Sequence, residues 1–229
     1  PPHDAERAKD LRVMLPQFAR PDEERMPMRD LSFIHRFHTP DDPDGSVIVL
    51  LHGTGGNESD LMPMAACLNP RGTLLGVRGR STEEGIARWF RRYDAVTYDQ
   101  ADIRAEAAAF ADFTAEAVKG YGLDPAWTTF LGYSNGANLL GAILRLHPGV
   151  VARAILLRGI EVLEAPPATD LTGTRALLLS GARDPFARMA PALEDALEAG
   201  GADLDARVIE AGHELTAADL EIAKDWIGA

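Results

Sequence analysis

Short apolar runs alternate with longer stretches of helical spacing from Leu31 onward, and this alternation restricts the fold more than any other feature of the chain. Sequences of this kind build βαβ units, in which a helix connects neighbouring parallel strands. Several apolar runs are continuous, such as Val47-Ile-Val-Leu-Leu51, as expected of strands that are buried on both faces. The sequence therefore predicts an α/β domain with a doubly wound, mostly parallel sheet and helices on both faces.

The expected strands and helices follow from where these runs begin and end. The last helix has a clear start signal, with Thr216 as N-cap and Asp219 three residues later. Strands are expected at residues 31–38, 46–52, 73–78, 128–132, 152–157, 175–180 and 206–210, and helices at 59–68, 103–119, 135–147, 186–199 and 217–227.

Length and charge limit the organisation and the partners. The 229 residues suit one globular domain at 28–229, preceded by an extension of unassigned role at 1–27. With 23 basic and 35 acidic residues the net charge is −12, which repels phosphate backbones, so no nucleic acid is expected. No apolar run approaches the roughly 20 residues of a membrane span. Without a hydrophobic leader, we expect a cytoplasmic location.

A serine lies at a predicted sharp turn, in the sequence Gly132-Tyr133-Ser134-Asn135-Gly136. An apolar strand precedes this turn and a helix follows it, which is the context of a nucleophile elbow. A side chain at either flanking glycine would collide with the adjoining strand and helix. Ser134 would then lie at a helix N-terminus, where backbone N–H groups favour developing negative charge.

A serine nucleophile needs a histidine base. Of six histidines, only His147 and His213 follow Ser134, which is the chain order of hydrolases with this elbow. His147 ends the elbow helix, about 20 Å from Ser134 at 1.5 Å per residue, and cannot reach it. His213 follows the last strand at the carboxyl edge of the sheet, where sites of such folds form. We therefore expect His213 to be the base.

The remaining groups have candidates in other loops at the same edge. Asp184 follows the strand at 175–180 and is the first candidate for the acid, with Glu161 as the alternative. The N–H of Asn135 and an N–H from the glycine-rich segment after the second strand, with that of Thr54 as the first candidate, would form the oxyanion hole. His52, in the same segment, is expected to fix the loop by hydrogen bonds, with a role as base the alternative.

These residues together resemble a known family. The segment LHGTGGNESDL at 51–61, the elbow, Asp184-Pro185 and Gly212-His213 resemble the α/β-hydrolase fold, in the phospholipase/carboxylesterase branch that includes acyl-protein thioesterases. The likeness runs from about Met28 to the C-terminus. It implies a triad of Ser134, Asp184 and His213, oxyanion donors at Thr54 and Asn135, no cofactor and no large lid domain. No metal is expected, because the histidines and acids show neither HExxH nor clustered ligand spacing.

The resemblance implies a serine carboxylesterase that hydrolyses small or medium esters through an acyl-enzyme intermediate. An acyl thioesterase or lysophospholipase is the alternative among enzymes, and a non-catalytic binding protein with this fold is the alternative from another class. Thioesterase members carry Gln and two glycines after the serine, whereas this chain has Asn135-Gly136-Ala137, which favours the ester. The expected partner is a small-molecule ester, and a homodimer stays open.

Two further groups of residues are candidates for substrate contacts. Met62, Trp89, Phe90 and Phe186 lie on loops or first turns after strands and are candidate walls of an acyl pocket, with core packing the alternative for each. Residues 71–92 contain six arginines and two glutamates, unlike the rest of the chain. They either bind an anionic or aromatic substrate or pair with acidic side chains on a solvated face.

Overall fold

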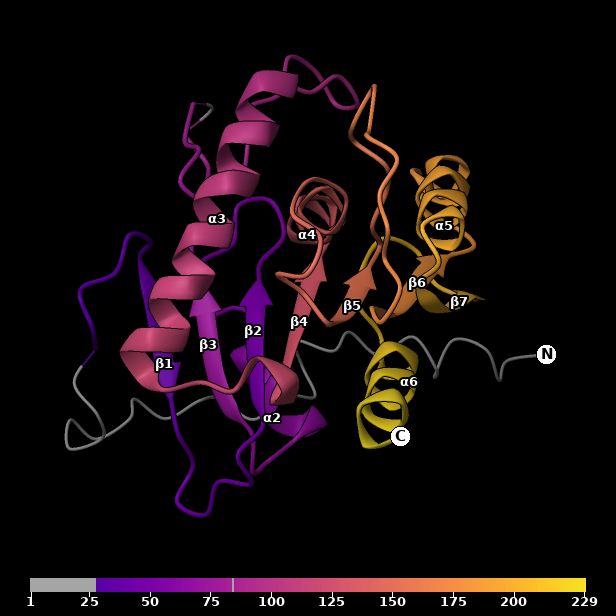
Figure 1. The fold of residues 1–229 in the computed structure, drawn as a ribbon. Coiled ribbons are helices and arrows are strands. Elements are labelled where there is room, and N and C mark those ends of the chain that lie inside the picture. The colour runs from indigo at the N-terminus through magenta and orange to yellow at the C-terminus, as the bar shows by residue number, and fades with distance from the viewer. Residues whose placement is uncertain (1–27, 84) are drawn as a thin grey trace.

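The centre of the molecule is a seven-stranded sheet with the strand order β1-β3-β2-β4-β5-β6-β7 (Figure 1). The computed structural model describes residues 28–83 and 85–229, so the expected extension at 1–27 lies outside it. Only β1 runs antiparallel, against β3. The strands are β1 (His35–His38), β2 (Val47–Leu51), β3 (Thr73–Val77), β4 (Thr128–Tyr133), β5 (Arg153–Leu157), β6 (Arg175–Gly181) and β7 (Asp203–Ile209).

Helices cover both faces of the sheet, as the sequence predicts. Helices α3, α4 and α5 lie on one face and α2 and α6 on the other (Figure 1), each over its own apolar cluster of buried side chains. The helices are α2 (Met62–Leu68), α3 (Gln100–Tyr121), α4 (Asn135–Leu146), α5 (Ala190–Ala199) and α6 (Ala217–Gly228), with short 3₁₀ turns at Pro125–Trp127 and Ala187–Met189. Within the described residues, no helix is long and apolar enough to cross a membrane.

The structure contains each expected strand and helix, with several shifted boundaries. Helices α2 and α5 begin later than predicted because Pro63 and Pro191 occupy their first turns, where a missing N–H costs nothing. Strand β7 begins three residues earlier, since Asp203 already pairs with Arg175 of β6. The predicted capping box of α6 is confirmed: an Asp219 carboxylate oxygen accepts from the Thr216 backbone N–H at 2.8 Å.

Candidate active site

Ser134 lies in the sharp turn between β4 and α4, with φ 51° and ψ −114°. This left-handed backbone is strained for any residue but glycine. A Cβ at Gly136 would stand 2.1 Å from the Leu51 carbonyl oxygen, and one at Gly132 would stand 2.7 Å from the backbone of Ala137. A side chain at either flanking glycine would therefore collide with the backbone of a strand or of the helix, as the sequence predicts.

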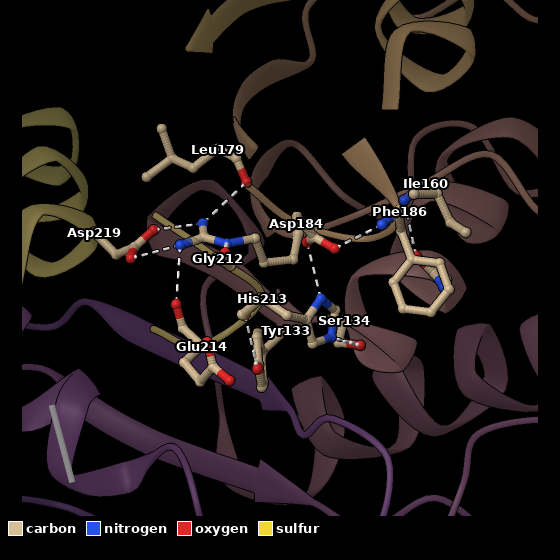
Figure 2. Close-up of polar contacts among 12 residues, drawn as sticks. Tyr133, Ser134, Ile160, Leu179, Asp184, Phe186, Gly212, His213, Glu214 and Asp219 are labelled. Atoms are coloured by element: carbon tan, nitrogen blue, oxygen red, sulfur yellow. Dashed lines mark hydrogen bonds and ion pairs between the residues drawn. The ribbon is translucent and has the colours of Figure 1, made fainter. Parts of the chain in front are cut away.

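A chain of two hydrogen bonds joins Ser134, His213 and Asp184 (Figure 2). The Ser134 Oγ is 2.9 Å from Nε2 of His213, and Nδ1 of His213 is 2.8 Å from Oδ2 of Asp184. The imidazole is 29% exposed and the carboxylate 4%. The ring can therefore be reached from solvent on one side, while its acid partner is shielded from water.

Neighbouring groups hold the ring and the carboxylate in place. The other Asp184 oxygen accepts from the Phe186 N–H at 2.8 Å, and the Phe186 ring meets the His213 ring edge-on at 5.5 Å between centroids. The Tyr133 hydroxyl donates to the His213 carbonyl at 3.0 Å. Tyr133 ends β4, and Asp184 and His213 follow the ends of β6 and β7, so three strand ends converge on Ser134.

Glu161, the alternative acid, is engaged elsewhere. One of its oxygens accepts from an Arg145 guanidinium N–H at 3.1 Å, and the other from the backbone N–H groups of Val162 and Leu163 at 2.9 Å. Its carboxylate closes the loop after β5 against the end of α4. Of the two acids considered from the sequence, Asp184 is the one that the fold brings to His213.

The segment after β2 presents the backbone N–H of Thr54, which is not used within the described fold. Gly55 donates its N–H to the Ala87 carbonyl at 2.8 Å. Among residues 28–83 and 85–229, no hydrogen bond engages the backbone N–H of Thr54 or that of Asn135. These are the two donors expected from the sequence, one on each loop.

His52 stabilises this segment as a neutral, buried ring. It is 1% exposed, with Nδ1 2.7 Å from the Gly53 carbonyl and Nε2 3.0 Å from the Gly79 N–H. A carbonyl only accepts and an N–H only donates, so Nδ1 carries the proton and Nε2 accepts. Burial lowers the pKa of His52, in agreement with this assignment. The loop-fixing role expected from the sequence matches this geometry.

Of the four candidate pocket walls, the fold brings only Phe186 to the triad. Met62, Trp89 and Phe90 are at most 1% exposed and pack in the two apolar clusters. This corresponds to core packing, the alternative role considered from the sequence. Trp89 still contacts two residues of the site. Its backbone N–H donates to the Asn135 side chain at 2.8 Å, and its indole N–H donates to the His52 carbonyl at 2.8 Å.

Most of the arginine-rich segment pairs with acids, which favours the solvated-face alternative. The Arg78 guanidinium contacts Glu58 with two of its nitrogens, one pair at 2.8 Å, and Arg80 contacts Glu106 at 3.0 Å. Arg88 differs, because it is buried and its guanidinium lies 3.4 Å from the Thr54 hydroxyl. Arg71 also pairs with Asp42, and Arg91 pairs with Glu83 and Asp99.

Two side chains lie near the histidine in a pairing that the sequence does not predict. Arg158 follows β5 and Asp219 lies in the first turn of α6, and the two form an ion pair in which neither side chain is exposed to solvent. The sequence does carry a signal for Arg158. It directly follows the apolar run Ala154-Ile-Leu-Leu157, and an arginine next to a buried strand is buried only when it is paired. The local pattern around Asp219 indicates only a helix cap.

The chain is similar over most of its length to known proteins. It is 43% identical to a carboxylesterase from Mesorhizobium loti, covering 88% of this chain and 97% of that one with a TM-score of 0.85. A Bacillus cereus carboxylesterase is 31% identical over 86% of this chain and 94% of its own, with a TM-score of 0.82. The Bacillus subtilis protein MhqD is 33% identical over 189 residues, 79% of this chain and 92% of that protein. No family model matches.

Proposed function

The chain belongs to the carboxylesterase family of α/β-hydrolases, and from this premise we propose that it hydrolyses small or medium carboxylic esters with a Ser134–His213–Asp184 triad. The observation that carries this function is the pair of hydrogen bonds at 2.9 and 2.8 Å that links the three side chains. A serine hydroxyl becomes a useful nucleophile only when a base accepts its proton. His213 is that base.

In the first half of the reaction, Ser134 Oγ attacks the ester carbonyl carbon while Nε2 of His213 accepts the hydroxyl proton. The N–H groups of Thr54 and Asn135 donate to the oxyanion of the tetrahedral intermediate. The intermediate collapses as its bond to the alcohol oxygen breaks and His213 gives that oxygen the proton. The acyl group is then esterified to Ser134 and the alcohol departs.

In the second half, His213 accepts a proton from water, whose oxygen attacks the acyl carbon. The new tetrahedral intermediate releases Ser134 Oγ, which recovers its proton from His213, and the carboxylic acid departs. Throughout, the Asp184 carboxylate accepts from Nδ1 of His213, so that Nε2 faces the serine. The carboxylate also stabilises the imidazolium that forms in each half.

The proposed preference for small or medium acyl groups is supported by the positions of the four residues expected to line an acyl pocket. Three of the four expected walls lie in the core, and Phe186 alone of these packs against His213. A long acyl chain needs more buried contact than the Phe186 and Tyr133 rings beside His213 supply, because its binding scales with apolar area removed from water. Long-chain lysolipids should therefore be poor substrates.

The test is hydrolysis of p-nitrophenyl esters of graded acyl length by the parent protein and by Ser134→Ala. We expect the rate to peak at short chains and kcat to fall by about 10³- to 10⁶-fold in the variant. Ser32→Ala, which replaces an exposed serine, should behave like the parent. Parallel kcat/KM values on acyl thioesters and lysolipids separate an esterase from the two enzymatic alternatives.

Two results would overturn this function. Unchanged activity in Ser134→Ala would assign the hydrolysis to another group. Absence of activity on every ester class, together with no labelling of Ser134 by a fluorophosphonate, would instead support a binding protein that kept the fold.

A further inference from the structure

A buried ion pair contacts the loop that carries His213, at residues 212–214. The Arg158 guanidinium and the Asp219 carboxylate are both fully shielded from solvent, and they meet through two parallel contacts, Nη1 to Oδ1 at 2.7 Å and Nη2 to Oδ2 at 2.9 Å. This fork-to-fork geometry fixes both planes relative to one another. A pair this rigid can fix the position of the other groups that its two side chains contact.

The remaining donors of Arg158 contact the backbone on both sides of the histidine (Figure 2). Nε donates to the Gly212 carbonyl at 2.8 Å, and Nη2 donates to the Glu214 carbonyl at 3.1 Å. Gly212 and Glu214 are the immediate neighbours of His213. One guanidinium therefore holds the chain just before and just after the residue that must face Ser134.

The guanidinium uses all of its donors. Nη1 also donates to the Leu179 carbonyl at 3.4 Å, on the strand that leads to Asp184. With the two carboxylate contacts and the two loop carbonyls, the five N–H groups of the side chain are each engaged. A lysine has three donors on a single point and no fork, so it could not replace this arrangement.

Asp219 connects the same cluster to α6. Its Oδ2 accepts from the backbone N–H and from the hydroxyl of Thr216, at 2.8 and 2.9 Å, in addition to the contact with Arg158. Thr216 is the N-cap of α6, three residues after His213. The start of α6, the histidine loop and the end of β5 are thereby joined through one carboxylate.

The backbone at Arg158 has an unusual conformation that supports the same interpretation. Within the described residues, Ser134 and Arg158 are the two non-glycine positions with positive φ, at 51° and 57°. They follow neighbouring strands, and the Ser134 N–H donates to the Leu157 carbonyl at 2.8 Å. Strain of this kind persists where surrounding contacts over-determine it, and it concentrates at functional sites.

We infer that the Arg158–Asp219 pair is a positioning device that sets the register of His213 against Ser134 and Asp184. The inference rests on the proposed function of the triad. A buried ion pair is often no more stabilising than apolar side chains of similar volume, so its effect on folding alone is expected to be modest when both partners are replaced. Its effect on turnover should be large, because a displacement of about 1 Å can lower a rate by about 100-fold.

The test is the double variant Arg158→Met/Asp219→Asn, which removes both charges while the amide oxygen introduced at position 219 can still accept from the Thr216 N–H. We expect kcat on p-nitrophenyl acetate to fall about 10- to 100-fold, with KM changed less than about threefold. The single variant Arg158→Lys should also have a lower kcat than the parent, because lysine cannot make the forked contacts. The low-field NMR signal of the His213 Nδ1 proton should shift or broaden, which a purely structural role would not require.

A matched control is available at a second buried pair, Arg145–Glu161, whose side chains are 8% and 14% exposed. It closes the loop after β5 at the far end of α4 and contacts none of the three triad residues. Arg145→Met/Glu161→Gln should lower the melting temperature to a similar degree and leave kcat and the His213 signal as in the parent.

The inference is overturned if Arg158→Met/Asp219→Asn keeps kcat within twofold of the parent with an unchanged His213 signal. If that variant does not fold, the single variant Asp219→Asn decides. It weakens the pairing with Arg158 while Arg158 keeps its contacts with the histidine loop, and we expect a lower kcat. An unchanged kcat in Asp219→Asn would refute the positioning role. Failure of the proposed function is distinguishable, because it appears as full activity in Ser134→Ala, while the NMR signal reports the His213–Asp184 bond without any turnover.

Discussion

At the scale of single residues, His52 shows how a buried polar group can organise a site without reacting in it. Burial lowers its pKa, an effect opposed by its bond to the Gly53 carbonyl and by the nearby Asp60 and Glu58 carboxylates. Protonation would also place a second ring N–H against the Gly79 N–H, which now donates to Nε2. The fold therefore requires the neutral ring, which holds the glycine-rich segment after β2 through its contacts with Gly53 and Gly79.

This requirement predicts a pH dependence of stability. An unfolded histidine titrates near pH 6.5, and the folded pKa of His52 is lower, so below about pH 6.5 the unfolded state binds the proton first. The free energy of unfolding should therefore decline as the pH falls from about 6.5 toward the folded pKa. His52→Gln, which does not titrate, should lack this part of the decline. Urea unfolding of both proteins across the range from about pH 8 to about pH 5 measures it, and parallel curves would contradict it.

At the scale of elements, the nucleophile elbow depends on a contact between α4 and β2. A Cβ at Gly136 would stand 2.1 Å from the Leu51 carbonyl oxygen, and neither backbone can yield without moving the sheet. Gly136→Ala should lower the free energy of unfolding by about 3 kcal/mol or more and abolish ester hydrolysis.

The control for that change is Gly228→Ala at the end of α6, where no atom lies within 4 Å of the added Cβ. Alanine there should leave hydrolysis unchanged and stabilise by at most about 1 kcal/mol. Denaturant titration and the ester assay compare the two variants. A Gly136→Ala protein as stable and active as Gly228→Ala would mean that the elbow tolerates far more displacement than its geometry allows.

The elements that could be predicted from the sequence are those whose signals are local. Continuous apolar runs identify the buried strands, and the elbow sequence with its strand and helix places Ser134. Chain order and the carboxyl-edge rule select His213 and make Asp184 the first candidate for its acid partner, and the fold does bring the two together. The capping box of α6 needs only residues three apart.

What could not be predicted depends on contacts between distant segments. Whether Trp89 and Phe90 face a pocket or the core is decided by how their segment packs against α3 and the sheet, which no local pattern reports. The role of Arg158 depends on carbonyls that lie 54 and 56 residues further along the chain, at Gly212 and Glu214. Asp219 has a sufficient local explanation as a cap, which conceals its contact with Arg158.

At the scale of the whole molecule, the sheet ends in β7, an edge strand that differs from the buried strands beside it. In the part of the chain that the structure describes, β7 pairs only with β6, so its outer row of backbone groups has no strand partner. Val208 is 71% exposed on this strand. Exposed edges promote association between chains, and charged side chains on the edge oppose it. Asp205 and Arg207, paired at 2.6 Å, supply those charges.

Removing this pair should therefore change the assembly of the molecule rather than its fold. Asp205→Thr/Arg207→Thr keeps the net charge at −12 and introduces residues that favour strands, so we expect concentration-dependent association through β7. Light scattering with size-exclusion chromatography measures it. Asp42→Thr/Arg71→Thr removes an exposed pair outside the strands and should leave the assembly of the parent unchanged. If both double variants elute like the parent at every concentration, the charges on β7 do not protect the edge, and the twist of the sheet or the packing of α5 must do so.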